Sequence, residues 1–171
     1  MSSAPTSTAG PERYCADCRP APLPLAGVRS VGLFDGPLRR AVHRLKYRGR
    51  RSAARPLADL LVAPARAMDL SADGATRPLV LPVPLHSERE RERGYNQASL
   101  LARPLADLLG LPYEPRLLRR VRPTASQVGL SRRQRRQNVR GAFGAEAGVA
   151  GRDILLVDDV TTTGSTLGSA A

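Results

Sequence analysis

ILLVDDVTTTGST, residues 154–166, places four apolar residues directly before two adjacent carboxylates and a loop of small hydroxyl residues. An apolar run this short is typical of a strand that is buried on both faces. Two neighbouring carboxylates are costly inside such a strand, because burial and mutual repulsion both disfavour their charged forms. We therefore expect Asp158 and Asp159 to lie where the strand emerges, together with a loop of small hydrogen-bond donors.

The segments around this stretch alternate between strand-like and helix-like patterns. Strands are predicted at 28–34, 78–85, 139–143 and 153–157, and helices at 38–47, 52–63 and 96–110. Ser52 is expected to cap its helix, with Pro56 in the first turn, and the helix that ends at Gly110 is expected to kink or restart at Pro104. This alternation predicts an α/β domain with a largely parallel sheet, flanked by helices, over residues 28–171.

Two local features refine this prediction. The heptapeptide RPLADLL occurs at 55–61 and again at 103–109, but its flanks do not match. We interpret the two copies as similar amphipathic helices and not as a repeat architecture. The prolines of the 78–85 segment indicate that this strand ends early or has an unpaired edge.

Composition favours a single domain with a sizeable core, because 42% of the 171 residues are hydrophobic. No window is long and apolar enough to span a membrane, and the start of the chain lacks the apolar core of a signal peptide. We expect a cytoplasmic protein without membrane insertion. Residues 1–27 are predicted to form a disordered tail and a short CxxC segment, in which Cys15 and Cys18 are thiols or metal ligands.

The charge of the chain is strongly positive and unevenly distributed. The formal net charge is +12, Lys46 is the only lysine, and residues 116–140 contain nine arginines and no acid. Such a cluster predicts affinity for phosphates, either free or in a polymer. A coding bias toward Ala, Arg, Gly and Pro is the alternative explanation for much of the arginine.

The end of the 153–157 strand is a candidate ligand site, because open α/β sheets bind ligands outside the carboxyl ends of their strands. Gly164 allows close approach of the backbone, and the hydroxyls that follow can donate to an anion at a helix N-terminus. The carboxylates can accept hydrogen bonds from vicinal hydroxyls or attract Mg²⁺. A ribose 5-phosphate satisfies both halves. The alternative is a structural Asp-Asp turn before a capped helix.

This stretch resembles the phosphoribosyl-diphosphate (PRPP) binding motif of type I phosphoribosyltransferases. Three further segments are similar to the ComF family of competence-associated phosphoribosyltransferase-like proteins: LKYRGR at 45–50, VPLHSERERERGYNQASLLA at 83–102 and QVGLSRRQRRQNVRGAF at 127–143. The resemblance covers about residues 15–171. It implies a type I phosphoribosyltransferase-like fold with a short N-terminal CxxC segment.

The resemblance also implies roles for individual residues. Asp158 and Asp159 would hold the ribose 2- and 3-hydroxyls. The 5-phosphate would lie in the loop formed by Thr162, Thr163, Gly164, Ser165 and Thr166. The RERERG segment looks like the family's loop near the pyrophosphate, where an extended backbone would point Arg89, Arg91 and Arg93 the same way. The alternative is a solvated run of alternating charge.

Residues 122–138 look like the mobile loop that closes over the substrate in this superfamily. Arg132, Arg135 and Arg136 would then neutralise the leaving pyrophosphate as catalytic residues, beside Asp158 and Asp159. A nucleic-acid contact is the other interpretation of these arginines, although the stretch lacks aromatic stacking platforms. Lys46 would contact a phosphate or would simply end a basic helix.

Two departures from the family pattern concern the ends of the chain. ComF-type proteins usually begin with paired CxxC motifs that form a zinc site, whereas Cys15 and Cys18 are a single pair, so we expect either that the upstream half of the site is lost or that the site is incomplete, with Zn²⁺ at Cys15 and Cys18 as the alternative. His43 and His86 are expected to be packing or surface residues. The family continues past GST with a helix and a strand, so we expect the C-terminal end of the fold to be missing.

The resemblance implies a transferase that binds PRPP with Mg²⁺, transfers the phosphoribosyl group to an unknown acceptor and releases pyrophosphate in the setting of DNA uptake. The alternative is a non-catalytic component of that machinery, which senses PRPP or binds single-stranded DNA or a competence helicase.

Overall fold

The computed structural model describes residues 23–47, 51–68, 77–125 and 129–171, so the tail with Cys15 and Cys18 lies outside the described residues. These ranges contain helices and strands in the order α1 (Gly36–Tyr47), α2 (Ala54–Arg66), β1 (Leu79–Pro82), α3 (Ser87–Arg93), α4 (Gln97–Leu109), β2 (Leu118–Arg120), α5 (Arg132–Val139), β3 (Phe143–Ala145), β4 (Ile154–Val157) and α6 (Ser165–Ala170). Short 3₁₀ turns lie at Arg51–Ala53 and Ala147–Val149. Across the described ranges, every helix is too short or too polar to cross a membrane.

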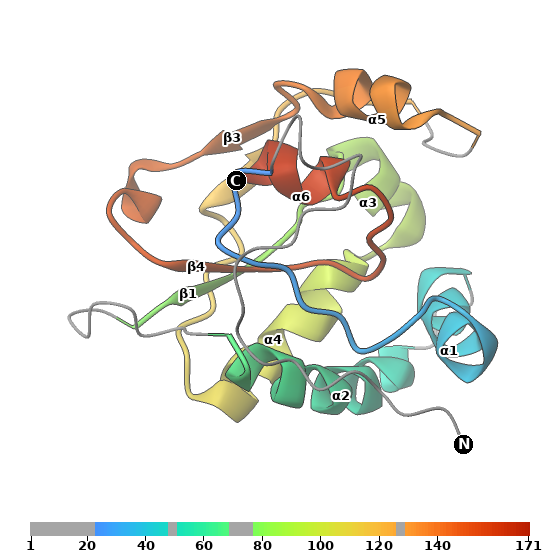
Figure 1. Cartoon of the computed structure of the whole chain (residues 1–171), viewed down its shortest axis with the longest axis vertical. Coiled ribbons are helices and arrows are strands. Elements are labelled where there is room, and N and C mark those ends of the chain that lie inside the picture. The colour runs from blue at the N-terminus through green and yellow to red at the C-terminus, as the bar shows by residue number, and fades with distance from the viewer. Residues whose placement is uncertain (1–22, 48–50, 69–76, 126–128) are drawn as a thin grey trace.

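The centre of the fold is a parallel pair of strands, β1 and β4, which lie side by side in Figure 1. Leu79 pairs with Ile154 at one end, and Pro82 pairs with Val157 at the other. The predicted strand at 153–157 is therefore confirmed, and the 78–85 segment forms a shorter strand than predicted. Pro82 occupies its last position, where a missing N–H costs the ladder least.

Both faces of this parallel pair are covered. Val80, Leu155 and Val157 pack into one hydrophobic cluster with α1, α2 and α4. Leu79 and Leu81 of β1 point to the opposite face, as do Ile154 and Leu156 of β4. These side chains pack with residues of β2 and β3. Figure 1 shows α2 and α4 on one side of the strands and α6 and β3 on the other. The α/β class is confirmed, and the short uninterrupted apolar run of β4 follows from burial on both faces.

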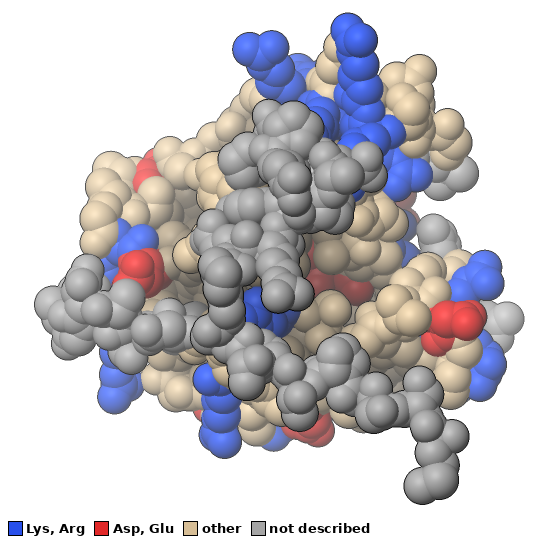
Figure 2. All heavy atoms as spheres, viewed as in Figure 1, with Lys and Arg blue, Asp and Glu red and all other residues tan. Residues whose placement is uncertain are grey.

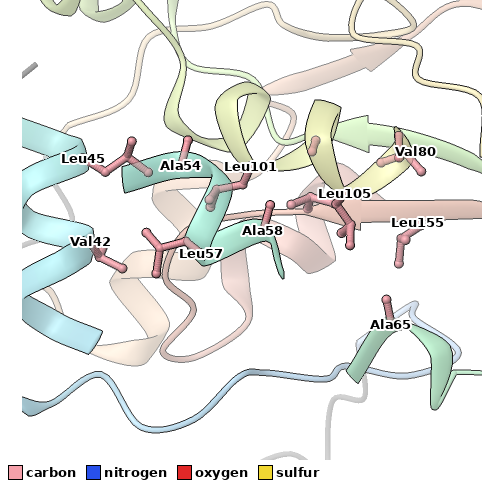
Figure 3. Close-up of a cluster of buried hydrophobic side chains, with 13 residues drawn as sticks. Val42, Leu45, Ala54, Leu57, Ala58, Ala65, Val80, Leu101, Leu105 and Leu155 are labelled. Atoms are coloured by element: carbon pink, nitrogen blue, oxygen red, sulfur yellow. The ribbon is translucent and has the colours of Figure 1, made fainter. Parts of the chain in front are cut away.

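The larger cluster is built around the repeated heptapeptide. In α2 it buries Leu57 and Ala58, and in α4 it buries the equivalent Leu105 and Ala106. Figure 3 shows side chains of α1, α2 and α4 converging with Val80 and Leu155. The prediction of two similar amphipathic helices is confirmed, and they share one core.

The ends of α4 follow local sequence signals. The Asn96 side chain accepts a hydrogen bond from the Ala98 N–H at 3.0 Å and donates to the Val83 carbonyl, also at 3.0 Å. Gly110 ends the helix with a φ of 66°, a conformation that glycine adopts without strain. Pro104 lies inside a single helix, so the helix does not restart there.

The predicted cap of α2 was wrong. Residues Arg51–Ala53 form a 3₁₀ turn, Ala53 occupies the N-cap position, and no side chain caps the helix there. Pro56 lies in the first turn, as predicted, where its missing N–H has no partner to lose. The α-helix starts two residues later than predicted, because the 3₁₀ turn at Arg51–Ala53 continues directly into it.

The predicted strand at 28–34 was also wrong: these residues form an irregular segment. Within the described ranges no strand pairs with it. Leu33 is 88% exposed and Val28 is 41% exposed. A short strand needs a neighbouring strand and a buried face, and among the described residues this segment has neither.

The predicted strand at 139–143 was wrong as well, because Val139 ends α5 and β3 begins only at Phe143. Ser131 and Gln134 form a capping box that starts α5. Gly141, with a φ of 61°, lies between the helix and the strand. β3 pairs antiparallel with β2 in a second small sheet, so the sheet structure is less uniformly parallel than predicted.

Candidate functional site

Asp158 and Asp159 follow β4 directly and lie at its carboxyl end, as predicted. The Asp158 Oδ1 atom accepts a hydrogen bond from the Asp159 backbone N–H at 2.8 Å. Both residues are partly buried. The strand thus holds two adjacent carboxylates in one turn, where a ligand at the sheet edge can reach them.

Lys46, at the C-terminal end of α1, forms an ion pair with this acidic turn. Its Nζ atom lies 2.9 Å from the Asp159 Oδ2 atom, and the two side chains are 22% and 10% exposed. The Tyr95 hydroxyl donates to the Leu45 carbonyl and ties the end of α1 to the start of α4. Arg51 lies over the Tyr95 ring at 5.2 Å. Lys46 therefore belongs to the site, through a carboxylate contact that the sequence did not predict.

Burial, and to a smaller extent the neighbouring charge of Asp159, raise the pKa of Asp158 from 3.8 to about 7. The hydrogen bond from the Asp159 N–H and the charge of Lys46 act in the opposite direction but do not cancel these effects. Close to neutral pH this carboxyl group therefore changes its charge. A perturbed carboxyl at the end of a sheet strand is a reason to consider the turn a functional site.

The loop after the acidic pair is ordered by its own hydroxyls. The Thr163 Oγ1 and Ser165 Oγ atoms lie 2.7 Å apart, and Ser165 is buried. Gly164 has a φ of 70°, and a Cβ atom there would collide with Leu23. The positive φ favours glycine at this position, and any larger residue would also have to displace the Leu23 side chain. Thr166 lies in the first turn of α6.

The predicted mobile loop at 122–138 is largely helical where it carries its arginines. Arg132, Arg135 and Arg136 lie on α5, and residues 126–128 are outside the described ranges. The Arg135 Nη1 atom donates to the Thr162 Oγ1 atom at 2.7 Å, which brings α5 to the hydroxyl loop. The Ser169 hydroxyl donates to the Val139 carbonyl and joins α6 to α5. A helix therefore presents these arginines, one of them in direct contact with the loop.

The expectation of an extended RERERG segment was wrong, because Ser87–Arg93 form helix α3. On a helix, Arg89 and Arg93 share one face and Arg91 points elsewhere. Glutamate and arginine favour helices, and Gly94 ends this one with a φ of 76°. Arg89 donates to the Thr124 carbonyl at 3.4 Å, whereas Arg91 bonds back to Ser87 of its own helix.

Arg120, on β2, is a residue of this region that the sequence did not single out. Its guanidinium lies 5.3 Å from the centre of the Phe143 ring and donates to the Thr124 hydroxyl. Burial lowers the pKa of Arg120, Arg89 lowers it further, and the charge of Asp158 raises it. The sequence alone does not distinguish Arg120 from its neighbour Arg119. The two side chains point to opposite faces of β2, and this becomes clear only once β2 is paired with β3.

A cavity of about 370 Å³ opens beside the acidic pair and runs beneath the 25–34 segment. Its walls are mainly apolar side chains of α1, α2, α4 and β4, and Asp158 and Asp159 also line it. The site thus has a charged part and an apolar part.

Metal ligation by protein side chains alone is not supported within the described ranges, where no group of three or more His, Cys, Asp and Glu residues could hold an ion. His43 stacks on Phe34 at 5.8 Å, in keeping with the predicted packing role. The donor set of Asp158 and Asp159 still suits Mg²⁺, which binds one or two carboxylates and takes its remaining ligands from water and substrate phosphates.

The fold and this site define an α/β protein with a candidate binding site at the carboxyl end of a buried parallel strand. The chain is 39% identical to the DNA utilization protein YhgH of Salmonella typhimurium over 163 residues, which are 95% of this chain and 72% of the relative. It is 36% identical to the YhgH protein of Escherichia coli strain K12 over 162 residues, or 92% and 69% of the two chains. It is 34% identical to competence protein F of Haemophilus influenzae over 158 residues, or 91% and 69%.

The chain belongs to the ComF family, which confirms the family assignment made from the sequence. No protein-family model matches the chain. No solved structure gives a significant match either, so the type I phosphoribosyltransferase-like fold stays a prediction.

Proposed function

We propose that this protein binds PRPP together with Mg²⁺ and transfers the phosphoribosyl group to an acceptor, releasing pyrophosphate. The observation that carries this proposal is the acidic turn at the end of β4, with Lys46 2.9 Å from Asp159 and with Arg135 on the hydroxyl loop that follows. Carboxylates suit the ribose hydroxyls, and hydroxyls with cations suit the phosphates. A ligand with a diol and phosphate groups matches both.

In this proposal each residue has a defined role. Ionised Asp158 and Asp159 accept hydrogen bonds from the 2- and 3-hydroxyls of the ribose. The loop at 162–166 donates to the 5-phosphate through its hydroxyls and backbone N–H groups. Arg135 and its neighbours on α5 neutralise the pyrophosphate, as guanidinium groups do for phosphoryl oxygens. Bound Mg²⁺ would add charge neutralisation on the diphosphate, with its protein ligands drawn from the acidic pair.

The transfer itself needs positioning more than acid–base chemistry. An electron pair of the acceptor forms the new bond to C1 of the ribose while the bond from C1 to the pyrophosphate oxygen breaks, and the leaving oxygen keeps its pair. The cations of α5 stabilise the negative charge that develops there. The apolar cavity beside the carboxylates would exclude water from C1, which limits hydrolysis.

The test is calorimetric titration of PRPP with Mg²⁺ into the wild type and into an Asp158→Asn/Asp159→Asn variant. We expect saturable binding by the wild type and at least about a hundredfold weaker binding by the variant, because two charge-assisted hydrogen bonds are lost.

The matched control for this experiment is Asp153→Asn. Asp153 is exposed and lies before the other end of β4, so this variant removes a carboxylate from the same strand without touching the acidic turn. It is expected to bind like the wild type. A wild type that is folded but does not bind PRPP would overturn the proposal.

The relatives carry names that refer to DNA utilization and competence, and we propose a role in the same processes for this chain. The basic surface favours a second candidate function, a component that contacts single-stranded DNA or a helicase without catalysis. In Figure 2, Lys and Arg atoms gather along the upper edge of the view, where Figure 1 places α5. DNA affinity through this surface should fall steeply with salt, whereas a transferase releases pyrophosphate when an acceptor is supplied.

A further inference from the structure

Lys46 reaches the acidic turn from the C-terminal end of α1, so its place depends on how that end of the helix is held. The last four carbonyls of a helix have no partner within the helix. The Leu45 carbonyl is one of them, and it accepts a hydrogen bond from the Tyr95 hydroxyl. The Leu45 side chain is fully buried in the core. The residue directly before Lys46 is therefore fixed both by its carbonyl and by its side chain.

Tyr95 is itself held at a corner between two helices. Gly94, which ends α3, precedes it, and Asn96, which caps α4, follows it. The Asn96 side chain donates to the carbonyl of Val83, directly after β1. Arg51 lies over the Tyr95 ring and donates to the Gly94 carbonyl at 3.2 Å. The hydroxyl that reaches α1 is thus connected, through its neighbours, to the carboxyl end of the central strand pair.

The hydrogen bond to α1 is the part of this arrangement that needs a tyrosine. A phenylalanine at position 95 would keep the ring and its contact with Arg51 but would lose the donor. The Lys46 side chain is long and flexible, so its ammonium stays on Asp159 more of the time if the backbone below it is fixed. Groups that are ordered before a ligand arrives strengthen binding, because their ordering is then not a cost of binding.

We propose that Tyr95 is a positioning residue of the acidic site: its hydroxyl fixes the end of α1 and thereby holds the Lys46 ammonium on Asp159. Leu45 and Tyr95 are 50 residues apart in the sequence, so their hydrogen bond joins two distant parts of the chain at the site. The ligand that benefits rests on the proposed function, in which it is PRPP. The positioning itself does not, because it can be measured in the protein without ligand.

The first test observes the Lys46 side chain by NMR without ligand. Because Lys46 is the only lysine, protein labelled with an NMR-active carbon isotope at the lysine ε-carbon gives a single lysine side-chain signal. In the wild type we expect distinct shifts for the two ε-protons, as for a side chain held in one rotamer. In Tyr95→Phe these shifts are expected to merge, because averaging over rotamers makes the two protons equivalent. Merged shifts already in the wild type, or separate shifts in a folded Tyr95→Phe, would overturn the proposal.

The matched control for this test is Tyr113→Phe. Tyr113 also has an arginine over its ring, Arg103 at 5.8 Å, and it bridges to Val80 within β1, before the carboxyl end of the sheet. Each variant therefore removes one phenolic oxygen from a ring that an arginine covers. Tyr113→Phe is expected to leave the Lys46 signal unchanged. Equal changes in the two variants would show a general loosening of the fold and would overturn the proposal.

The second test asks whether the effect of Tyr95 on the ligand passes through Lys46. PRPP affinity in the presence of Mg²⁺ is measured by calorimetry for the wild type, Tyr95→Phe, Lys46→Met and the double variant. We expect Tyr95→Phe to weaken binding about fivefold when Lys46 is present, the effect of one neutral hydrogen bond, and less than about twofold when Lys46 is replaced. The same loss in both backgrounds would indicate a merely structural role and would overturn the proposal.

The outcomes separate this inference from the proposed function. Merging of the Lys46 shifts in Tyr95→Phe, in a protein that does not bind PRPP, would support the positioning role and reject the proposed function. PRPP binding that depends on the acidic pair, with separate Lys46 shifts retained in Tyr95→Phe, would do the reverse.

Discussion

Asp158→Asn is expected to stabilise the folded protein at pH 8, and this gain should shrink as the pH falls through 7 toward 4. In the folded protein the pKa of Asp158 is raised from 3.8 to about 7, chiefly by burial. Between these values the folded protein holds a proton that the unfolded chain has released, so stability falls as the pH rises through this window and stays low above it. The loss is at most about 4 kcal/mol.

Asparagine avoids this loss because it cannot ionise, and its Oδ1 atom can still accept the hydrogen bond from the Asp159 N–H. The measurement is urea denaturation of both proteins at pH 5, 6, 7 and 8, with Asp153→Asn as the control. Asp153 is exposed, and its replacement should leave the pH dependence as in the wild type. A variant that is equally or less stable than the wild type at pH 8 would contradict the prediction. A gain in stability on removal of the Asp158 charge would show that the wild type keeps this charge at a cost. Residues kept at such a cost usually serve binding or catalysis.

Leu57→Ala is expected to lower the free energy of unfolding by about 2–5 kcal/mol. Leu57 is 6% exposed and lies in the cluster that joins α1, α2 and α4 to the strands. Figure 3 shows its side chain among those of Val42, Leu101 and Leu105. Truncation removes buried apolar surface and leaves a cavity, because neighbouring helices cannot close completely around it.

The matched control is Leu60→Ala, the same substitution one turn further along α2. Leu60 is 52% exposed, so its truncation should cost less than about 1 kcal/mol. Both variants keep the helix propensity equal, since each replaces leucine by alanine in the same helix. Similar urea midpoints for the two variants would contradict the burial of Leu57 in a core shared by α2 and α4.

Local sequence signals were sufficient for β4, for the ends of α4 and for the repeated heptapeptide, where the structure depends on neighbours along the chain. The β4 run and its acidic end were predicted because burial on both faces leaves an unbroken apolar segment, and charge is excluded from it. The C-terminal end of α4 was predicted because Gly110 acts on the backbone within a few residues, and the helix predicted from residue 96 is capped by the Asn96 side chain. The two copies of RPLADLL were assigned to helices for the same reason.

Three of the predictions that were wrong failed for two reasons, one for want of a distant partner and two because a local helix signal was missed. The 28–34 segment has strand-forming residues such as Val28, Val31 and Phe34, but no strand of the described ranges pairs with it. The RERERG alternation suggested an extended loop, whereas its residues favour a helix that ends at Gly94. The arginines of 122–138 were expected on a loop, and the helix that starts with the capping box at Ser131 carries four of them: Arg132, Arg133, Arg135 and Arg136.

The sequence by itself determined the family, the parallel strand with its two carboxylates and the helices that cover one face, because these features depend on motifs and on periodicity. Only the tertiary structure decided which cations face the carboxylates. Lys46 reaches Asp159 from α1, and Arg120 reaches the region of Asp158 from β2. The chain contains 27 basic residues of nearly one kind, so their type carries little information about position. Their neighbours are set by the packing of elements far apart in the chain, and that packing also buries Asp158 and raises its pKa.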